Sequence, residues 1–461
     1  MEKEELLNKK EVGWKNISSE SKERIFKFSD EYIYFLNKVK TEREAVKFIK
    51  KMLDENGFCD INLKEQLKSG DKVYCINRDK SMYVAIIGKE PLVNGLKVLG
   101  AHIDSPRLDL KPNPLYEDNG FAYLKTHYYG GIKKYQWTTI PLSIHGVIIK
   151  SNGEKIEVSI GEEECDPIFT ITDLLPHLAQ DQMEKKLKDG ISGEDLNILV
   201  GSIPLDDKDI SEKIKLNILA LLNEKYGIKE IDFVSSELEI VPAFRARSLG
   251  FDRSMIAAYG QDDRVCAYTS VRAILDVVNP EKTAVCILSD KEEIGSMGNT
   301  GMESHVFDYF ISELLNKTNQ NIPNALEKVL CNSYMLSADV DAGLDPIYAS
   351  VSEKNNAAMI GYGIGLNKYT GSRGKSGASD ANAEFVAKVR KIFEDANIPY
   401  QVSELGRVDV GGGGTIAYIL ANKGMDVIDC GVPVLSMHAP YEVTSKFDVY
   451  CAYKAYNEFI K

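Results

Sequence analysis

Two histidines directly follow apolar runs of the kind that form buried strands, and a metal ion or a substrate could be bound beside each of them. His102 follows the run KVLGA, and His438 follows VPVLSM. Continuous apolar runs are typical of parallel strands covered on both faces, and α/β proteins bind ligands at the carboxyl ends of such strands. Asp104 shares a face with His102 on an extended chain, so its carboxylate could orient the imidazole for metal binding. The alternative is that the HxD pattern is an ordinary surface turn.

Acidic residues lie at three comparable places. Glu292 and Glu293 follow the run TAVCILSD, and Asp339 ends the run NSYMLSAD. Asp262 and Asp263 open the helix-like text DRVCAYTSVRAIL. In such a pair one carboxylate can bind a metal while the other acts as a general base. Ordinary alternatives stay open, namely a helix cap for Asp262, a turn residue for Asp339 and solvated surface charge for the two glutamates.

The remaining chemical motifs are weaker. Only six histidines occur, so a metal site would consist mainly of carboxylates. Residues 411–414 are four glycines in front of the helix-like text IAYILANKG. They could present N–H groups to a substrate carbonyl or carboxylate, or form a flexible turn, but the phosphate-binding pattern GxxxxGK[ST] is absent. Taken from the residues alone, four histidines are expected to be structural or on the surface: His127, His145, His177 and His305.

The pattern of elements predicts an α/β fold around a mainly parallel sheet. Apolar periodicity predicts a helix over residues 20–56. Strands are expected at VYCI, MYVAIIG, KVLGAHID, TAVCILSD, NSYMLSAD and MDVIDCGVP. Helices are expected between them, at DRVCAYTSVRAILDVV, ASDANAEFVAKVRKIFEDA and GTIAYILANKG.

The middle of the chain has a different pattern. Residues 111–242 contain alternating text typical of antiparallel strands, such as LSIHGVIIKSNGEKIEVSIG, and a helical stretch is expected near 181–226. We interpret residues 111–242 as an inserted second domain that interrupts a first domain made of residues 1–110 and 243–461.

Composition limits the function classes. The chain has 461 residues, 44% of them hydrophobic, so it can bury a large core. Its net charge of −13 argues against nucleic acid or an anionic membrane as the main partner. No apolar run reaches the roughly 18 residues of a membrane span, and the charged start MEKEELLNKK is not a secretory signal. Eight scattered cysteines without a CxxC pattern are expected to be free thiols, so a cytoplasmic protein is predicted.

Five motifs, taken together and in order, resemble the aspartyl aminopeptidase / vacuolar aminopeptidase I family of dizinc metallopeptidases. The motifs are GAHIDSPRLDL, QDDR, DKEEIGS, SAD and VPVLSMHAPYE, and they extend over nearly the whole chain. The resemblance implies a bacterial-type member with an α/β/α sandwich catalytic domain (phosphorylase/hydrolase-like) and an inserted β-rich dimerisation domain. It also implies homo-oligomers, with dimers that assemble to a dodecamer.

The resemblance also implies a role for individual residues. Asp104 is the implied orienting carboxylate beside its histidine, and Glu292 is the implied general base. His177, on the inserted domain, is the implied residue that reaches a neighbouring subunit's active site and helps to hold the substrate carbonyl. Five residues are implied as metal ligands, with the first aspartate of QDDR as the bridge between both ions: His102, Asp262, Glu293, Asp339 and His438.

The implied reaction is removal of the N-terminal residue from peptides that carry a free α-amine. Two divalent ions, most simply Zn²⁺ with Co²⁺ or Mn²⁺ as options, share a bridging water. Glu292 takes the proton of that water and passes it to the leaving amine. Two alternatives stay open: a deacylase or carboxypeptidase of the wider dizinc clan, and a non-catalytic self-assembling shell that binds peptides or cargo.

One position departs from the family pattern for acidic N-termini. Members specific for acidic residues carry a histidine three positions after the aspartate of SAD, where this chain has Ala342. A later lysine is also used in those members, and Lys368 or Lys375 could take its place. A neutral or broad preference is therefore as open as an acidic one.

Overall fold

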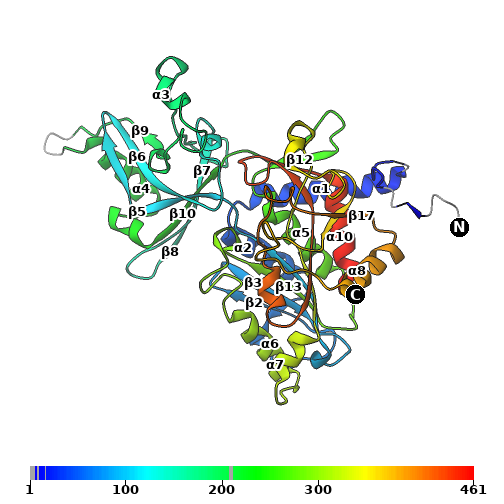
Figure 1. Ribbon diagram of the computed structural model, residues 1–461. Helices are drawn as coiled ribbons and strands as arrows, with labels where there is room; N and C mark the ends of the chain where they lie inside the picture. The colour runs from blue at the N-terminus through cyan, green and yellow to red at the C-terminus, as the bar shows by residue number, and fades with distance from the viewer. Residues whose placement is uncertain (1–5, 8–9, 16, 207–210) are drawn as a thin grey trace. The chain divides into compact units, whose positions relative to one another are not determined.

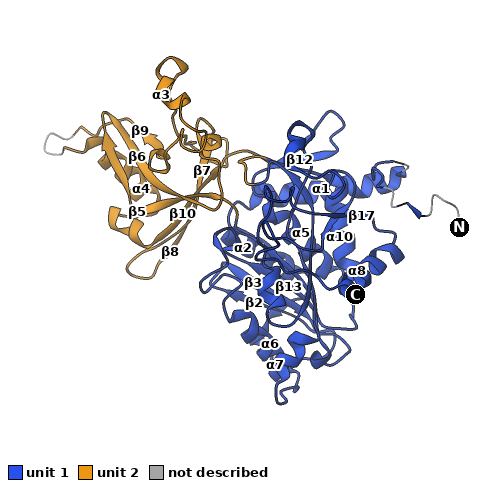
Figure 2. Cartoon of the chain, viewed as in Figure 1, with its two compact units in different colours: residues 1–104, 246–437, 442–461 blue, residues 105–245, 438–441 orange. Residues whose placement is uncertain are grey.

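A computed structural model describes residues 6–7, 10–15, 17–206 and 211–461. The chain forms two compact units (Figure 2). Unit 1 consists of residues 1–104, 246–437 and 442–461, and unit 2 consists of residues 105–245 and 438–441. The second unit is therefore an insertion in the chain of the first, with one further short segment at 438–441.

Unit 1 is built on a mixed sheet of nine strands, of which the central four are parallel. The strands in spatial order are β1 (Cys59–Asp60), β2 (Lys72–Asn77), β3 (Ser81–Ile86), β13 (Ala284–Ser289), β4 (Lys97–His102), β14 (Tyr334–Ser337), β18 (Asp426–Gly431), β16 (Ile364–Asn367) and β17 (Tyr400–Ser403). All six strands predicted from apolar runs are present in this sheet.

Helices cover both faces of this sheet because successive residues of a buried strand point to opposite sides. Val98 and Val285 belong to one hydrophobic cluster, and their neighbours Leu99 and Cys286 belong to another. The second cluster contains the helices α1 (Ser19–Lys38), α2 (Glu42–Glu55), α5 (Gln261–Leu275), α8 (Ala383–Asp395) and α10 (Lys446–Ile460). The first contains α6 (Val306–Lys317), α7 (Ala325–Cys331) and α9 (Ala417–Ala421). Figure 1 shows α6 and α7 side by side.

The expected single helix over residues 20–56 is wrong, because the chain forms two helices there. Val39 has an extended backbone and ends α1. Thr41 begins α2 with a capping box: its hydroxyl accepts from the N–H of Glu44, whose carboxylate accepts from the N–H of Thr41. This reciprocal cap satisfies N–H groups that a continuous helix would have used internally, so it starts a new helix inside a continuous apolar pattern.

A smaller sheet of five strands completes unit 1. It consists of β11 (Arg247–Leu249), β12 (Met255–Ala258), β20 (Glu442–Ser445), β19 (Pro433–Leu435) and β15 (Asp341–Ala342). Within the described part of the chain, no helix is both long enough and apolar enough to cross a membrane.

Unit 2 contains a six-stranded antiparallel sheet. Its order is β8 (Lys155–Ile160), β7 (Leu142–Ile149), β10 (Ser236–Pro242), β5 (Arg107–Asp118), β6 (Phe121–Tyr129) and β9 (Ile198–Gly201). The helical stretch expected near 181–226 is wrong in its middle. It consists of α3 (Gln180–Met183) and α4 (Lys213–Tyr226), with β9 between them, and residues 207–210 lie outside the described parts. The expectation rested on the charge-rich composition of this stretch. Residues 198–201 form strand β9 instead, because they pair with β6.

Candidate active site

Three adjacent parallel strands of unit 1 bring acidic residues to one edge of the sheet. β4 ends at His102, β13 ends at Ser289 and β14 ends at Ser337. In the register of the sheet, Ser289 lies opposite His102 and Ser337 lies opposite Gly100. The segments that leave these strands therefore start side by side, and they carry Asp104, the pair Glu292-Glu293 and Asp339.

His102 is the centre of the resulting cluster, and only 1% of it is exposed. Its Nδ1 lies 3.0 Å from the carbonyl oxygen of Asp104. A carbonyl oxygen can only accept, so Nδ1 carries the proton and Nε2 faces the acids. Nε2 lies 3.2 Å from Oδ1 of Asp262, 3.8 Å from Oδ1 of Asp339 and 3.9 Å from Oε2 of Glu292. This tautomer is the one that leaves Nε2 as a metal ligand.

Asp104 holds two parts of the cluster together. Its carboxylate is fully buried. Oδ1 accepts the N–H of Glu292 at 3.1 Å, and Oδ2 accepts the N–H of Glu293 at 3.2 Å. Oδ1 also lies 3.3 Å from Nδ1 of His102. One carboxylate thus positions both the imidazole and the loop that carries the two glutamates.

The two aspartates at the start of α5 have non-helical backbone angles, and the peptide bond between them is cis. Asp262 faces Nε2 of His102, whereas Oδ2 of Asp263 accepts the backbone N–H of His102 at 3.3 Å. Glu442 holds this turn from β20, because its Oε2 accepts the N–H groups of Gln261 at 2.6 Å and Asp262 at 3.1 Å.

The electrostatics of the cluster favour a bound cation. Burial by itself lowers the pKa of His102, but hydrogen bonds to Asp104 and Asp262 and the charge of Asp339 raise it well above its usual value. Burial raises the pKa of Asp263 and of Asp339 well above the ordinary range, and neighbouring carboxylates raise both further. Several carboxylates around one imidazole are costly to bury unless a cation compensates them.

The donor atoms of the cluster fit metal ions. Ligand atoms of His102, Asp263 and Asp339 lie within 4.8 Å of one another, and so do those of His102, Glu292 and Glu293. Imidazole nitrogen and carboxylate oxygen are zinc ligands. The residues present therefore fit a zinc site, in which Nδ1 of His102 would keep its bond to Asp104 and Nε2 would bind the metal.

Two predicted residues belong to unit 2. His438 lies in the segment 438–441, and its Nδ1 donates to the carbonyl oxygen of Gly131 at 2.9 Å. This bond leaves the lone pair on Nε2, as a ligating histidine requires. His177 lies exposed in a short 3-10 helix, Pro176–Leu178. Ala342 lies in β15 and is partly buried.

Asp263 and Glu442 were missed as site residues in the sequence analysis. The QDDR motif implied a role for Asp262 alone. The signal for Asp263 was its place in the same doublet at the start of a helix, where both side chains can lie near the site. Glu442 is the last residue of the motif VPVLSMHAPYE. Its place in a motif that also contains His438 was the only indication in the sequence that it could lie near the site. Its partners, Gln261 and Asp262, are some 180 residues away in the chain.

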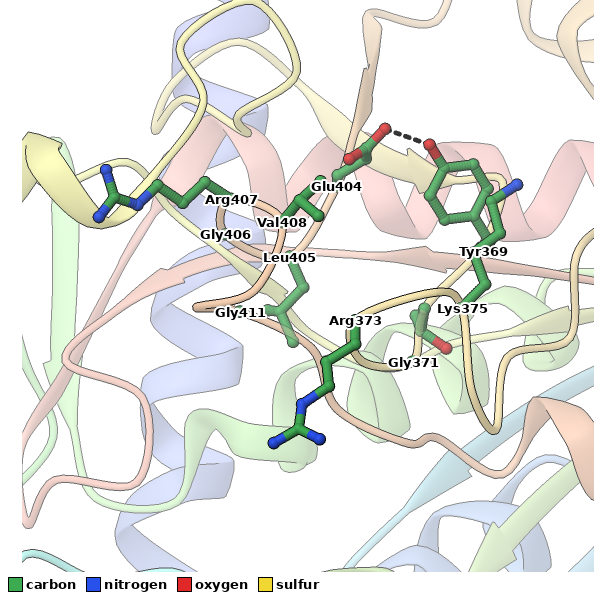
Figure 3. A pocket seen from close by; sticks show the side chains of 11 residues that line it. Tyr369, Gly371, Arg373, Lys375, Glu404, Leu405, Gly406, Arg407, Val408 and Gly411 are labelled. Carbon is green, nitrogen blue, oxygen red and sulfur yellow. Dashed lines mark hydrogen bonds between the residues drawn. The ribbon is translucent and has the colours of Figure 1, made fainter.

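The lysines considered for an acidic preference lie near a separate cavity of about 160 Å³ in unit 1 (Figure 3). Lys375 lines it, with its Nζ 3.8 Å from the ring centre of Tyr369 and 2.8 Å from Asp380. Lys368 also approaches Asp380, at 3.7 Å. Figure 3 shows the hydrogen bond from Tyr369 to Glu404 in the same cavity. Both ammonium groups therefore already have an acidic partner.

A buried cluster of one imidazole and several carboxylates at the carboxyl ends of parallel strands is the donor set of a metal-dependent enzyme. Comparisons with known proteins give the family. Residues 35–460 match the family model described as aminopeptidase I zinc metalloprotease (M18). The chain therefore belongs to the M18 family and is a zinc metallo-aminopeptidase.

Relatives of this family align along the whole chain. A probable M18 family aminopeptidase 1 from Clostridium acetobutylicum is 53% identical over 460 residues, which is 99% of each chain. The crystal structure of an M18 aminopeptidase from Thermotoga maritima is 47% identical and superposes with a TM-score of 0.95, covering 99% of this chain and 100% of that one. A chain of the yeast mApe1 dodecamer is 23% identical and superposes with a TM-score of 0.76. The alignment covers 94% of this chain and 96% of the yeast chain, so the two share the same fold.

Proposed function

We propose that this aminopeptidase uses two divalent ions, most simply Zn²⁺, to remove the N-terminal residue from peptides with a free α-amine. The proposed ligands are His102, Asp262, Glu293, Asp339 and His438. The observation that carries the proposal is the buried convergence of Asp262, Asp339 and Glu292 on Nε2 of His102. Nδ1 of His102 and Nδ1 of His438 each bond to a backbone carbonyl oxygen, and this leaves Nε2 of both rings to face a metal ion.

When bound, zinc lowers the pKa of a water molecule and polarises the substrate carbonyl. Glu292 is the proposed general base because its carboxylate lies 3.9 Å from Nε2 of His102 and is more exposed than those of Asp262 and Asp339. Its oxygen takes a proton from the attacking water and later donates it to the departing amine nitrogen. Asp104 keeps Glu292 in place through the backbone N–H and keeps His102 in the ligating tautomer. Removal of such an outer carboxylate costs roughly 10–100-fold in metal affinity or activity.

The N-terminal preference is proposed to be neutral or broad. Ala342 offers no charged or polar side chain, and Lys368 and Lys375 already face Asp380. Acidic side chains would therefore find weaker recognition at these positions than in members that carry a histidine there.

Unit 2 is proposed to be a dimerisation domain, within an assembly like the yeast dodecamer. The segment that carries His177 exposes several large apolar side chains, each at least half exposed, which is unusual for a free surface. They are Ile168, Leu174, Leu175, Leu178, Met183 and Leu187. Burial of this segment against a second copy would place His177 in an interface, and a monomeric mass by light scattering at micromolar concentration would refute this.

The site of action is proposed to be the cytoplasm. All eight cysteines are free, including the exposed Cys165 and Cys331, as expected in a reducing compartment.

The test of the function is hydrolysis of aminoacyl chromogenic amides of Asp, Glu, Leu, Met and Lys, with an N-acetylated leucyl amide as control. Activity is measured before chelation, after it, and after zinc or cobalt is added back. Cleavage of free-amine substrates alone, lost on chelation and restored by metal, is expected. Cleavage of the acetylated substrate would favour a deacylase, and no cleavage with any metal would favour a non-catalytic shell.

A further inference from the structure

A second buried polar cluster lies on the nine-stranded sheet, beside the strands that carry the acidic site. In the sheet register Ser337 lies opposite Asp429, Asp429 lies opposite Asn367, and Asn367 lies opposite Ser403. Residues directly opposite each other on neighbouring strands point to the same face. Four polar side chains therefore form a row across β14, β18, β16 and β17, which we call the polar row.

Two residues that lie outside these four strands contact the polar row and belong to it. Thr415, which follows the four glycines, donates from its hydroxyl to Oδ1 of Asp429 at 2.7 Å. The hydroxyl of Ser403 contacts Oδ2 of Asp341 and also lies 2.8 Å from Oδ1 of Asn367. A side chain at residue 365 would clash with Asp341, since an added Cβ would lie 2.5 Å from its Oδ2. Gly365 thus makes room for this carboxylate.

Both carboxylates of the polar row are buried, and neither has a cationic side chain of the described residues within ion-pair distance. Asp341 is fully buried and Asp429 is 2% exposed. Neither forms an ion pair with any part of the chain that the structure describes. Burial raises the pKa of Asp429 to about 6. Burial of an ionised carboxylate without an ion-pair partner costs free energy. A cation bound between these two carboxylates would offset that cost.

The hydrogen bonds of the polar row are also incomplete. Oδ1 of Asp341, Oδ2 of Asp429 and Oγ of Ser337 are buried and form no hydrogen bond of normal geometry with the described residues. Ser403 has one hydroxyl proton and faces two acceptors, so it can serve only one of them at a time. Three buried oxygens of the polar row thus lack a well-formed hydrogen bond, although nearly all buried polar groups in native proteins are satisfied.

We propose that the polar row binds one Ca²⁺ ion, with Asp341 and Asp429 as carboxylate ligands and the oxygens of Ser337 and Asn367 as neutral ligands. Every donor of the row is oxygen, which selects a hard cation over zinc. Two carboxylates balance the charge of a divalent ion. Ca²⁺ tolerates irregular geometry and 6–8 oxygen ligands, whereas Mg²⁺ requires near-octahedral geometry and retains its waters.

The site is distinct from the proposed zinc site because it contains no imidazole and shares no ligand with it. The two are nevertheless close along the chain, because Asp339 and Asp341 both follow β14. A filled polar row would therefore stabilise the segment that carries a proposed zinc ligand.

The test is metal content and thermal unfolding of the full chain. The protein is stripped with EDTA, desalted, and reloaded with excess Zn²⁺ alone or with Zn²⁺ and 1 mM Ca²⁺. After desalting, mass spectrometry of the elements is expected to find about one calcium per chain, and calcium is expected to raise the unfolding midpoint by several degrees because it binds only the folded state. Asp429→Asn should keep the acceptor for Thr415 but remove the charge, and should lose both effects. Asp426→Asn, on the same strand, is the matched control and should keep them.

Two results would overturn the proposal. Wild-type protein without bound calcium and without a calcium-dependent midpoint would mean that the two carboxyl groups share a proton, and this result does not depend on whether any variant folds. A shift with Na⁺ or K⁺ alone would contradict a divalent ion. Hydrolysis by the zinc-reloaded enzyme is measured in parallel, so failure of the peptidase proposal is seen separately.

Discussion

The substitution Asp104→Asn tests whether one buried carboxylate organises the catalytic centre. The wild-type carboxylate accepts the N–H groups of Glu292 at 3.1 Å and Glu293 at 3.2 Å, each with a different oxygen. Asparagine has one acceptor oxygen and an NH₂ group, so one backbone N–H loses its partner and meets another donor. An unsatisfied buried donor costs about 1–3 kcal/mol, which corresponds to a factor of roughly 5–150.

The expected result is weaker zinc binding and slower turnover, each by about 10–100-fold, because the glutamate loop and the ring of His102 lose their common anchor. Zinc affinity is measured by competition with a chromogenic chelator, and kcat with a leucyl amide at saturating zinc. Asp448→Asn is the matched control, since Asp448 is fully buried and accepts two backbone N–H groups, from Gly361 at 2.6 Å and Gly363 at 2.7 Å.

The control variant is expected to unfold at a lower temperature but to bind zinc normally. Zinc affinity and kcat of Asp104→Asn within twofold of wild type would refute the anchoring role. An equal loss of zinc affinity in both variants would show a general effect of destabilisation instead.

Three further predictions concern other residues. Glu292→Gln should lower kcat by roughly 10²–10⁴-fold with zinc content unchanged, because it removes the proposed base; Glu281→Gln, an exposed surface change, should have no effect, and a loss below tenfold would exclude Glu292 as the base. Thr41→Ala should lower the free energy of unfolding by about 0.5–2 kcal/mol through loss of the cap of α2, whereas Thr41→Ser should keep it; equal unfolding midpoints for both variants would contradict the capping role. Burial raises the pKa of Cys75 to about 11, so its thiol stays protonated at pH 8 and should alkylate far more slowly than the exposed Cys165; comparable rates by peptide mass spectrometry would contradict this.

Much of the catalytic unit could be predicted from local sequence. The runs KVLGAHID, TAVCILSD and NSYMLSAD all form central strands, because a strand covered on both faces needs apolar residues at every position. The prediction of one continuous helix over residues 20–56 was wrong, because a capping box at Thr41 starts a second helix while the apolar pattern continues. The prediction of a helical stretch near residues 181–226 was wrong in its middle, because residues 198–201 pair with β6 and form a strand.

The sequence alone determined which chemistry was available. Acids and a histidine at strand ends, in a chain with few histidines, indicated carboxylate-rich metal binding, since strand formation and side-chain chemistry are local properties. The tertiary structure decided which of these groups meet. Asp104 meets the N–H groups of Glu292 and Glu293, and Glu442 meets that of Asp262, across nearly 190 and 180 residues. Such contacts depend on strand order and register, which arise from packing of the whole sheet and are not encoded in any short segment.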